Sequence, residues 1–256
     1  MNATKIEYLT HTWNPITMRC TPVSEGCRHC WHLGMADRLK TNPGISAARR
    51  DAYAGGRPRL NLNEIGAPSR LKNPGIIGVQ FMGDLFHEAV TDDMRIDAFA
   101  AMQAAQHHFF IILTKRAENM KRFINGPLDY FDTYPAGTPL FPHVLIGVSV
   151  EDQRTADERI PVLLDTRFGH GHKVVSLEPM IEPVRFDSYP DWVIMGCESG
   201  SGARPMQREW AVDVARQCEV RDIPLFYKQG PGDGGYYGKM PTLNGREYRQ
   251  YPAVMR

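Results

Sequence analysis

Residues 75–82, Gly-Ile-Ile-Gly-Val-Gln-Phe-Met, form the apolar run that best indicates how this chain folds. A nearly continuous apolar run of this length is typical of a strand that is buried on both faces. A helix is expected after it over 91–106, where Thr91 is suited to cap the N-terminus. The apolar side chains of that helix share one face: Met94, Ala98, Met102 and Ala105.

The same alternation of strand and helix continues toward the C-terminus. Further strands are predicted over 109–113, 143–150, 173–177, 192–195 and 224–227. Helices are expected over 118–125 and around two apolar series, Ala156 to Leu164 and Trp210 to Cys218. Apolar strands that alternate with amphipathic helices indicate a parallel sheet covered by helices. We therefore predict an α/β fold, a partial (β/α)6-type TIM barrel; a doubly wound open sheet is the alternative.

Two regions fall outside this alternation, although residues 1–256 are expected to form a single domain. Residues 41–75 read as a basic insertion loop, rich in Pro and Gly. Its charged residues are Arg49, Arg50, Arg57, Arg59, Arg70 and Lys72 against Asp51 and Glu64. Residues 230–256 read as a Gly- and Tyr-rich C-terminal tail. Long loops in compact domains often form lids or binding surfaces.

The bulk composition excludes a membrane protein and a disulfide-stabilised secreted module. The chain has 256 residues, of which 42% are hydrophobic and 23% charged, and its net charge is +1. No stretch resembles a signal peptide or a membrane span. We expect a cytoplasmic protein with no membrane partner, in which structural disulfides are not favoured.

Three cysteines near the N-terminus, Cys20, Cys27 and Cys30, have the spacing C-x6-C-x2-C. Three clustered thiolates are suited to an iron–sulfur cluster and leave one iron of a four-iron cluster open to another ligand. A structural zinc site is the alternative, with His29 or His32 as the fourth ligand. A redox pair of Cys27 and Cys30 would leave Cys20 unexplained.

Polar residues follow almost every predicted strand. In barrels and open parallel sheets the active site lies at the carboxyl ends of the strands. The exits of this chain therefore predict a polar pocket at one end of the sheet. They are residues 83–88 (GDLFHE), 114–116 (TKR), 149–152 (SVED), 178–180 (EPM), 196–204 (GCESGSGAR) and 228–229 (KQ).

With these motifs in view, the chain resembles radical S-adenosylmethionine (SAM) enzymes and, more narrowly, the phage three-cysteine-motif proteins related to them. The resemblance covers about residues 6–230. It is carried by Trp13-Asn14-Pro15, the cysteine triad, 82–88 (MGDLFHE), 113–116 (LTKR), 147–152 (GVSVED), 176–179 (SLEP) and 196–205 (GCESGSGARP).

The resemblance implies two cofactors, a [4Fe–4S] cluster on Cys20, Cys27 and Cys30 and SAM on its open iron. Cleavage of SAM would give a 5′-deoxyadenosyl radical that abstracts hydrogen from the substrate, with a flavodoxin- or ferredoxin-like electron donor as partner. The methionine amine maps to Gly83 and Asp84, the ribose to Ser149 and Glu151, and adenine to His29.

The chain also departs from the wider superfamily. The first cysteine gap has six residues instead of three, His29 replaces an aromatic residue, and Met82-Gly83-Asp84 replaces Gly-Gly-Glu. These departures bear on the SAM contacts more than on the cluster ligands.

Five further residues are candidates for the reaction itself. Cys197 is suited to donate a hydrogen atom to a substrate radical, and core packing is the alternative. His87 is suited to proton transfer, with helix capping as the alternative. Lys115 is suited to bind a carboxylate or phosphate, or to form a structural ion pair. Glu178 and Glu198 are suited to bind SAM hydroxyls or a substrate amine, or to pair with Lys228 or Arg204.

The expected substrate is a nucleic-acid base or nucleotide. The basic 41–75 segment is suited to a nucleic-acid backbone, and solvated loop charge is the alternative. The specific hypothesis, which rests on the family resemblance, is isomerisation or hypermodification of a 5-substituted, amino-acid-bearing thymidine in phage DNA. The alternatives are radical repair of a DNA lesion and a non-catalytic zinc or cluster protein that binds nucleic acid.

Overall fold

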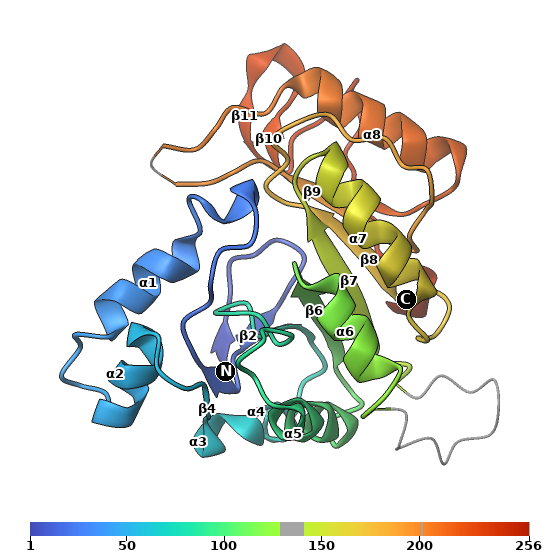
Figure 1. The fold of residues 1–256 in the computed structure, drawn as a ribbon. Helices are drawn as coiled ribbons and strands as arrows, with labels where there is room; N and C mark the ends of the chain where they lie inside the picture. The colour runs from blue at the N-terminus through green and yellow to red at the C-terminus, as the bar shows by residue number, and fades with distance from the viewer. Residues whose placement is uncertain (129–140, 201, 256) are drawn as a thin grey trace.

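A computed structural model describes residues 1–128, 141–200 and 202–255 of the chain. Its main feature is a nine-stranded, largely parallel sheet with the order β1-β2-β5-β6-β7-β8-β9-β10-β11 (Figure 1). The inner strands from β2 to β10 are parallel, and β1 and β11 pair antiparallel at the edges. The strand bounds are β1 Asn2–Ala3, β2 His11–Trp13, β5 Ile76–Val79, β6 Phe109–Thr114, β7 Val144–Val150, β8 Lys173–Leu177, β9 Trp192–Gly196, β10 Leu225–Pro231 and β11 Tyr237–Lys239.

The order of the strands in the sheet follows their order in the sequence. Because β–α–β crossovers are right-handed, such an order places the connecting helices on one face and curls the sheet toward a barrel. A doubly wound sheet would instead reverse its strand order at a switch point. The helices that connect neighbouring parallel strands are α5 Asp92–Gln103, α6 Ala117–Ile124, α7 Gln153–Asp165 and α8 Arg208–Val220. The predicted α/β fold is confirmed, and in the described residues the sheet is open between β1 and β11.

Both faces of the sheet are buried, which explains why its central strands are mostly apolar. In β6, Phe110 and Ile112 pack toward the helices, whereas Ile111 belongs to a second cluster on the opposite face. In β9, Val193 packs toward the helices and Trp192 joins the second cluster. A strand buried on both faces gains from an apolar residue at every position.

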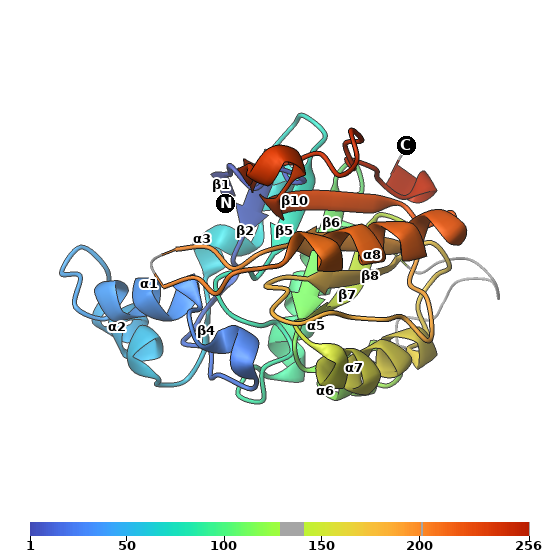
Figure 2. The ribbon, with the colours of Figure 1, turned by 90° about the horizontal axis from the view of Figure 1, so that it is seen from above.

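The first correction concerns residues 41–75, which are more than a loop. They contain α2 Ala47–Ala54, β4 Arg59–Leu60, α3 Leu62–Ile65 and α4 Ala67–Arg70. Strand β4 pairs with β3, Ile16–Thr17, and α2 contacts α1, Trp31–Leu39. With the cysteine segment they form a helical lobe, residues 19–75, whose helices α1 and α2 project beside the sheet (Figures 1 and 2). Short helices of this kind depend on tertiary contacts, which local sequence does not reveal.

The N-terminal and C-terminal segments also differ from expectation. The parallel sheet begins with β2, well before the first strand that we predicted. The tail is not separate either, because β10 runs through Pro231 and β11 pairs with it. No helix in the described parts of the chain has the length and apolar character needed to cross a membrane.

Candidate functional site

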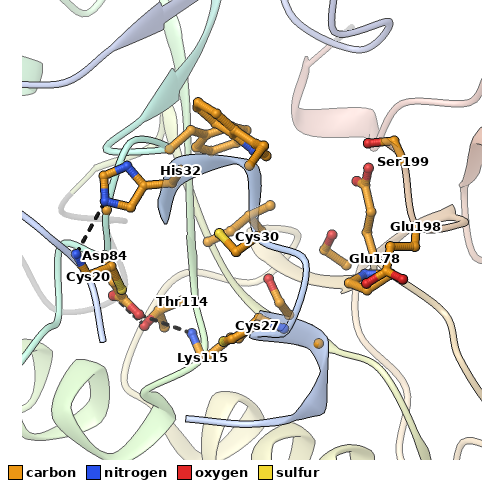
Figure 3. Close-up of a pocket in the computed structure, with 18 of the residues that line it drawn as sticks. Cys20, Cys27, Cys30, His32, Asp84, Thr114, Lys115, Glu178, Glu198 and Ser199 are labelled. Atoms are coloured by element: carbon orange, nitrogen blue, oxygen red, sulfur yellow. Dashed lines mark hydrogen bonds between the residues drawn. The ribbon is translucent and has the colours of Figure 1, made fainter. Parts of the chain in front are cut away.

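A cavity of about 240 Å³ lies where the strand exits meet the cysteine segment (Figure 3). The three cysteines line one part of its wall, and Glu178, Glu198 and Ser199 line another. The walls between them come from the exits of β5 to β10. Their lining residues include Gly83, Asp84, Thr114, Lys115, Ser149, Ser176, Cys197 and Lys228. The carboxyl ends of the parallel strands thus converge as predicted.

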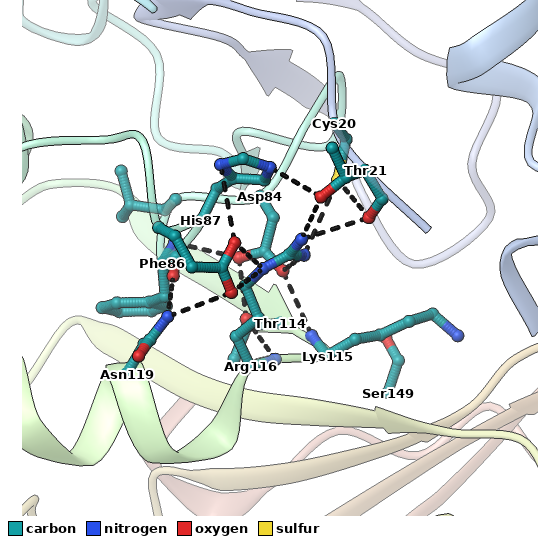
Figure 4. A network of polar contacts seen from close by, with 12 residues as sticks. Cys20, Thr21, Asp84, Phe86, His87, Thr114, Lys115, Arg116, Asn119 and Ser149 are labelled. Atoms are coloured by element: carbon teal, nitrogen blue, oxygen red, sulfur yellow. Dashed lines mark hydrogen bonds and ion pairs between the residues drawn. The ribbon is translucent and has the colours of Figure 1, made fainter. Parts of the chain in front are cut away.

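The guanidinium of Arg116 contacts the first cysteine, Cys20, and the neighbouring Thr21 (Figure 4). Its Nη1 donates to Asp84 at 3.2 Å and lies 3.7 Å from the Cys20 Sγ. Its Nη2 donates to the carbonyl and hydroxyl oxygens of Thr21, and its Nε donates to Glu88. Arg116 is 7% exposed, so this one guanidinium ties the β6 exit to the cysteine segment away from bulk water. Burial and Asp84 together raise the pKa of the Cys20 thiol to about 12, against the opposing effect of Arg116.

Asp84 already has four protein donors. Its carboxylate accepts hydrogen bonds from the Phe86 amide, the Thr114 hydroxyl, the Lys115 amide and Arg116. This carboxylate therefore holds the β5 and β6 exits together, rather than standing free for a ligand amine. The neighbouring Gly83 has φ +148°, and a Cβ there would meet Gln80 and Met18 at 2.9 Å. Only glycine fits this turn at the cavity wall.

A buried ion pair supports the cysteine segment from the other side. Lys115 Nζ donates to Glu151 at 2.9 Å, and Arg159 donates to the same carboxylate oxygen at 2.9 Å. Burial alone would raise the pKa of Glu151, but the Lys115 and Arg159 charges outweigh it and hold that pKa below its ordinary value. Gly26 lies directly on this pair, since a Cβ there would stand 2.7 Å from Lys115 Nζ and 2.9 Å from the Glu151 carboxyl carbon.

Glu198 connects the loop after β9 to the cysteine segment. Its carboxylate accepts from the side chain of Arg204 at 2.6 and 3.0 Å and contacts His29 Nδ1 at 3.1 Å. Arg204 also donates to the backbone carbonyl of Glu25 at 3.0 Å. Burial would raise the pKa of Glu198, but these hydrogen bonds outweigh it and lower that pKa to about 2. Ser201 of this loop lies outside the described residues.

The wall opposite the cysteines carries a second ion pair and a thiol. The Lys228 ammonium pairs with Glu178, and their side chains are 15% and 19% exposed. Burial would lower the pKa of Lys228, but Glu178 outweighs it and raises that pKa. Cys197 is buried next to this pair, and burial together with Glu178 raises the pKa of its thiol, although a hydrogen bond with Tyr237 opposes the rise.

The histidines near the cysteines are already engaged. His32 Nε2 accepts from the Cys20 amide at 3.2 Å, and burial and the Arg19 charge lower the pKa of His32 to about 4. His87 does not line the cavity. Its Nδ1 accepts from the Ala89 amide, so the neutral ring donates through Nε2 to the Thr21 hydroxyl at 2.9 Å. His87 therefore buttresses the cysteine segment.

The donor set fits an iron–sulfur cluster. All five cysteines are free thiols, and four of them line the same cavity: Cys20, Cys27 and Cys30 on the cysteine segment, and Cys197 after β9. Thiolates are the usual ligands of such clusters, each on its own iron. In the described residues no group of three or more His, Cys, Asp or Glu side chains is placed to hold a single metal ion.

The structure brings together every residue selected from the sequence except two. His87 and Glu151 lie behind the cavity wall, and the others line it: Cys20, Cys27, His29, Cys30, Gly83, Asp84, Lys115, Ser149, Glu178, Cys197 and Glu198. The prediction did not single out Gln80, Trp31 or Ser176, which also line the cavity. Gln80 is buried with φ +56° and bonds both backbone groups of Ile16. A positive φ at glutamine leaves no sequence signal, whereas the place of Trp31 beside Cys30 was a signal that could have been used.

A family model described as "Protein of unknown function (DUF5131)" matches residues 3–252, nearly the whole chain. No curated protein and no solved structure matches this chain.

Proposed function

We propose that this chain, which belongs to the DUF5131 family of proteins of unknown function, is a radical SAM enzyme that modifies a nucleic-acid base or nucleotide. The observation that carries the proposal is the cavity itself, where three free thiols on one wall face an ion pair and a thiol on the other. A bound [4Fe–4S] cluster with SAM would supply the 5′-deoxyadenosyl radical that starts the reaction.

The residues of the chain have separate tasks in this proposal. Cys20, Cys27 and Cys30 would hold the cluster, and Arg116 keeps Cys20 in place through Thr21 and the sulfur itself. Ser149 remains on the wall for a ribose hydroxyl, whereas Glu151 is committed to Lys115 and Arg159. The wall with Cys197 is left for the substrate.

The ion pair of an ammonium and a carboxylate on this wall supports a narrower proposal for the substrate, one that carries an amino acid. Lys228 and Glu178 pair with each other in this structure, and they carry the charges that would complement the carboxylate and ammonium of an amino acid exchanged into this pair. This complementarity favours isomerisation of a 5-substituted, amino-acid-bearing thymidine over repair of an unsubstituted lesion. Cys197, which lines the same cavity and whose thiol is affected by both charges of that pair, is the candidate hydrogen donor.

The test is anaerobic reconstitution with iron and sulfide, reduction, addition of SAM and quantification of 5′-deoxyadenosine. We expect iron binding and 5′-deoxyadenosine in the wild type and neither in Cys20→Ala, Cys27→Ala or Cys30→Ala. The matched control is Cys218→Ala, because Cys218 is buried in α8 away from the cavity. Tight zinc with no cluster in the wild type would refute the proposal and favour the nucleic-acid-binding alternative. Modified and irradiated DNA, compared as substrates, separate isomerisation from lesion repair.

A further inference from the structure

Charge is distributed very unevenly between the helical lobe and the rest of the chain. Residues 19–75 contain ten Lys and Arg against four Asp and Glu, a net charge of +6. The whole chain carries only +1, so the remaining residues carry −5. A basic surface of this kind on an otherwise acidic protein is the electrostatic signature of a polyanion partner.

Part of this positive charge has no internal partner. Arg57, Arg59 and Lys72 are exposed, and their side chains make no hydrogen bond or ion pair in the described structure. In the pairing of β3 with β4, Arg59 lies opposite Thr17, and Thr17 is three residues before Cys20 in the sequence. Arg59 is therefore paired with the strand that leads directly into the segment that carries the cysteines.

Trp31 lies where the lobe meets the cavity. It begins α1 immediately after Cys30, lines the cavity and is 55% exposed. Its only aromatic neighbour in the described residues is His32, which it meets edge-on at 6.3 Å. By contrast, Trp13 and Trp192 are fully buried. An exposed indole at a cavity rim is suited to stack on a planar ring.

From these observations we infer that the lobe binds single-stranded nucleic acid and that Trp31 is the stacking platform for the base that enters the cavity. The inference rests on the proposed function only for the role of the cavity. Because the positive charge lies outside the cavity, it serves a polymer with flanking phosphates and not a free nucleotide. A base that must reach a recessed cavity has to leave its duplex, so an unpaired strand is the preferred form.

The test is fluorescence anisotropy of a labelled fifteen-nucleotide thymidylate strand with the full chain as purified, over a series of salt concentrations. Trp31→Ala is expected to weaken binding roughly 5- to 150-fold, the usual effect of losing one base–aromatic stack, and Trp31→Phe to retain most of the affinity. The matched control is Tyr236→Ala, since Tyr236 is 60% exposed but does not line the cavity.

The lobe is tested by the double variant Arg57→Ser/Arg59→Ser. Loss of two phosphate contacts should reduce the slope of log affinity against log salt by about 1.4, at about 0.7 per single-strand contact. The control Arg154→Ser/Arg216→Ser removes the same charge from helices of the barrel and should leave the slope unchanged. Binding of the wild type to the strand should exceed binding to its duplex and to thymidine monophosphate.

Three results would each overturn the inference: equal affinity in Trp31→Ala and wild type, an unchanged slope in the Arg57/Arg59 variant, or equal binding of strand and mononucleotide. The assay needs neither iron nor SAM. If the chain forms 5′-deoxyadenosine normally but shows none of the predicted strand binding, only the nucleic-acid-binding role of the lobe is refuted. If it binds the strand as predicted but forms no 5′-deoxyadenosine, only the radical chemistry is refuted.

Discussion

Replacement of Arg116 by glutamine should be the most destabilising polar substitution near the cysteine segment. The Arg116 and Asp84 side chains are 5% and 6% exposed and 3.2 Å apart. Removing one member of a buried ion pair leaves the other charge without compensation, which costs about 3–5 kcal/mol. The second partner, Glu88, is 61% exposed, so its pairing adds at most about 1 kcal/mol. The expected loss in the free energy of unfolding is therefore about 3–5 kcal/mol.

The measurement is urea unfolding of the iron-free full chain under reducing conditions, followed by circular dichroism. The control is Arg154→Gln, because the Arg154–Glu158 pair is more than half exposed on both sides and should contribute less than about 0.5 kcal/mol. Combining Arg116→Gln with Asp84→Asn should cost less than the sum of the two single changes by about 1 kcal/mol or more, since the two residues are in contact.

If Arg116→Gln loses no more stability than Arg154→Gln, or if the double variant is strictly additive, the reasoning about a buried, interdependent pair is refuted. Iron content after reconstitution adds a second readout. Arg116 holds Thr21 and touches the Cys20 sulfur, so Arg116→Gln should bind less iron than the wild type at equal helix content.

Two further predictions concern the support of the cysteine segment. Gly26→Ala should lower the iron-to-protein ratio after reconstitution, because the new Cβ would collide with Lys115 and Glu151. The control Gly34→Ala in α1 should not lower it, because a Cβ at Gly34 would meet no neighbouring atom within 4 Å. Equal ratios in the two variants would contradict the packing argument. The folded pKa of Glu198 is lowered to about 2, so its hydrogen bonds stabilise the fold above the ordinary carboxyl pKa and are lost as pH falls from about 4.5 toward 2. The difference in melting temperature between wild type and Glu198→Gln should accordingly be largest near pH 7 and shrink below pH 4.5; a constant difference would exclude this linkage.

Local pattern was enough to predict most of the parallel sheet and the helices that cover it. Residues 109–113 are apolar at every position because both faces of the sheet are buried, and they coincide closely with β6. Residues 173–177, apolar except for Lys173 and Ser176, coincide with β8. Thr91 caps α5 by accepting from the Met94 amide, as expected from its short hydroxyl side chain. The convergence of the strand exits followed from the parallel order alone, because parallel strands end at one edge.

Pattern failed where stability comes from distant contacts. The short β2, β3 and β4 and the helices of the lobe have no periodicity long enough to detect, and they exist through pairing and packing across the fold. The roles of individual site residues depend on such contacts too. Asp84, Glu151 and His87 have residue types suited to ligand binding or proton transfer, yet in the fold their polar atoms are engaged by neighbours from strand exits, loops and helix α7.

The fold class, the strand exits and the cluster of three cysteines could be predicted from the amino-acid sequence alone, because apolar periodicity and cysteine spacing are local properties. The tertiary structure decided which polar groups remain available on that wall. Lys228, Glu178, Trp31 and Arg116 line the cavity, with Arg116 tied to Asp84, whereas Glu151 lies behind the wall, since pairing between buried charges is settled only when distant segments meet.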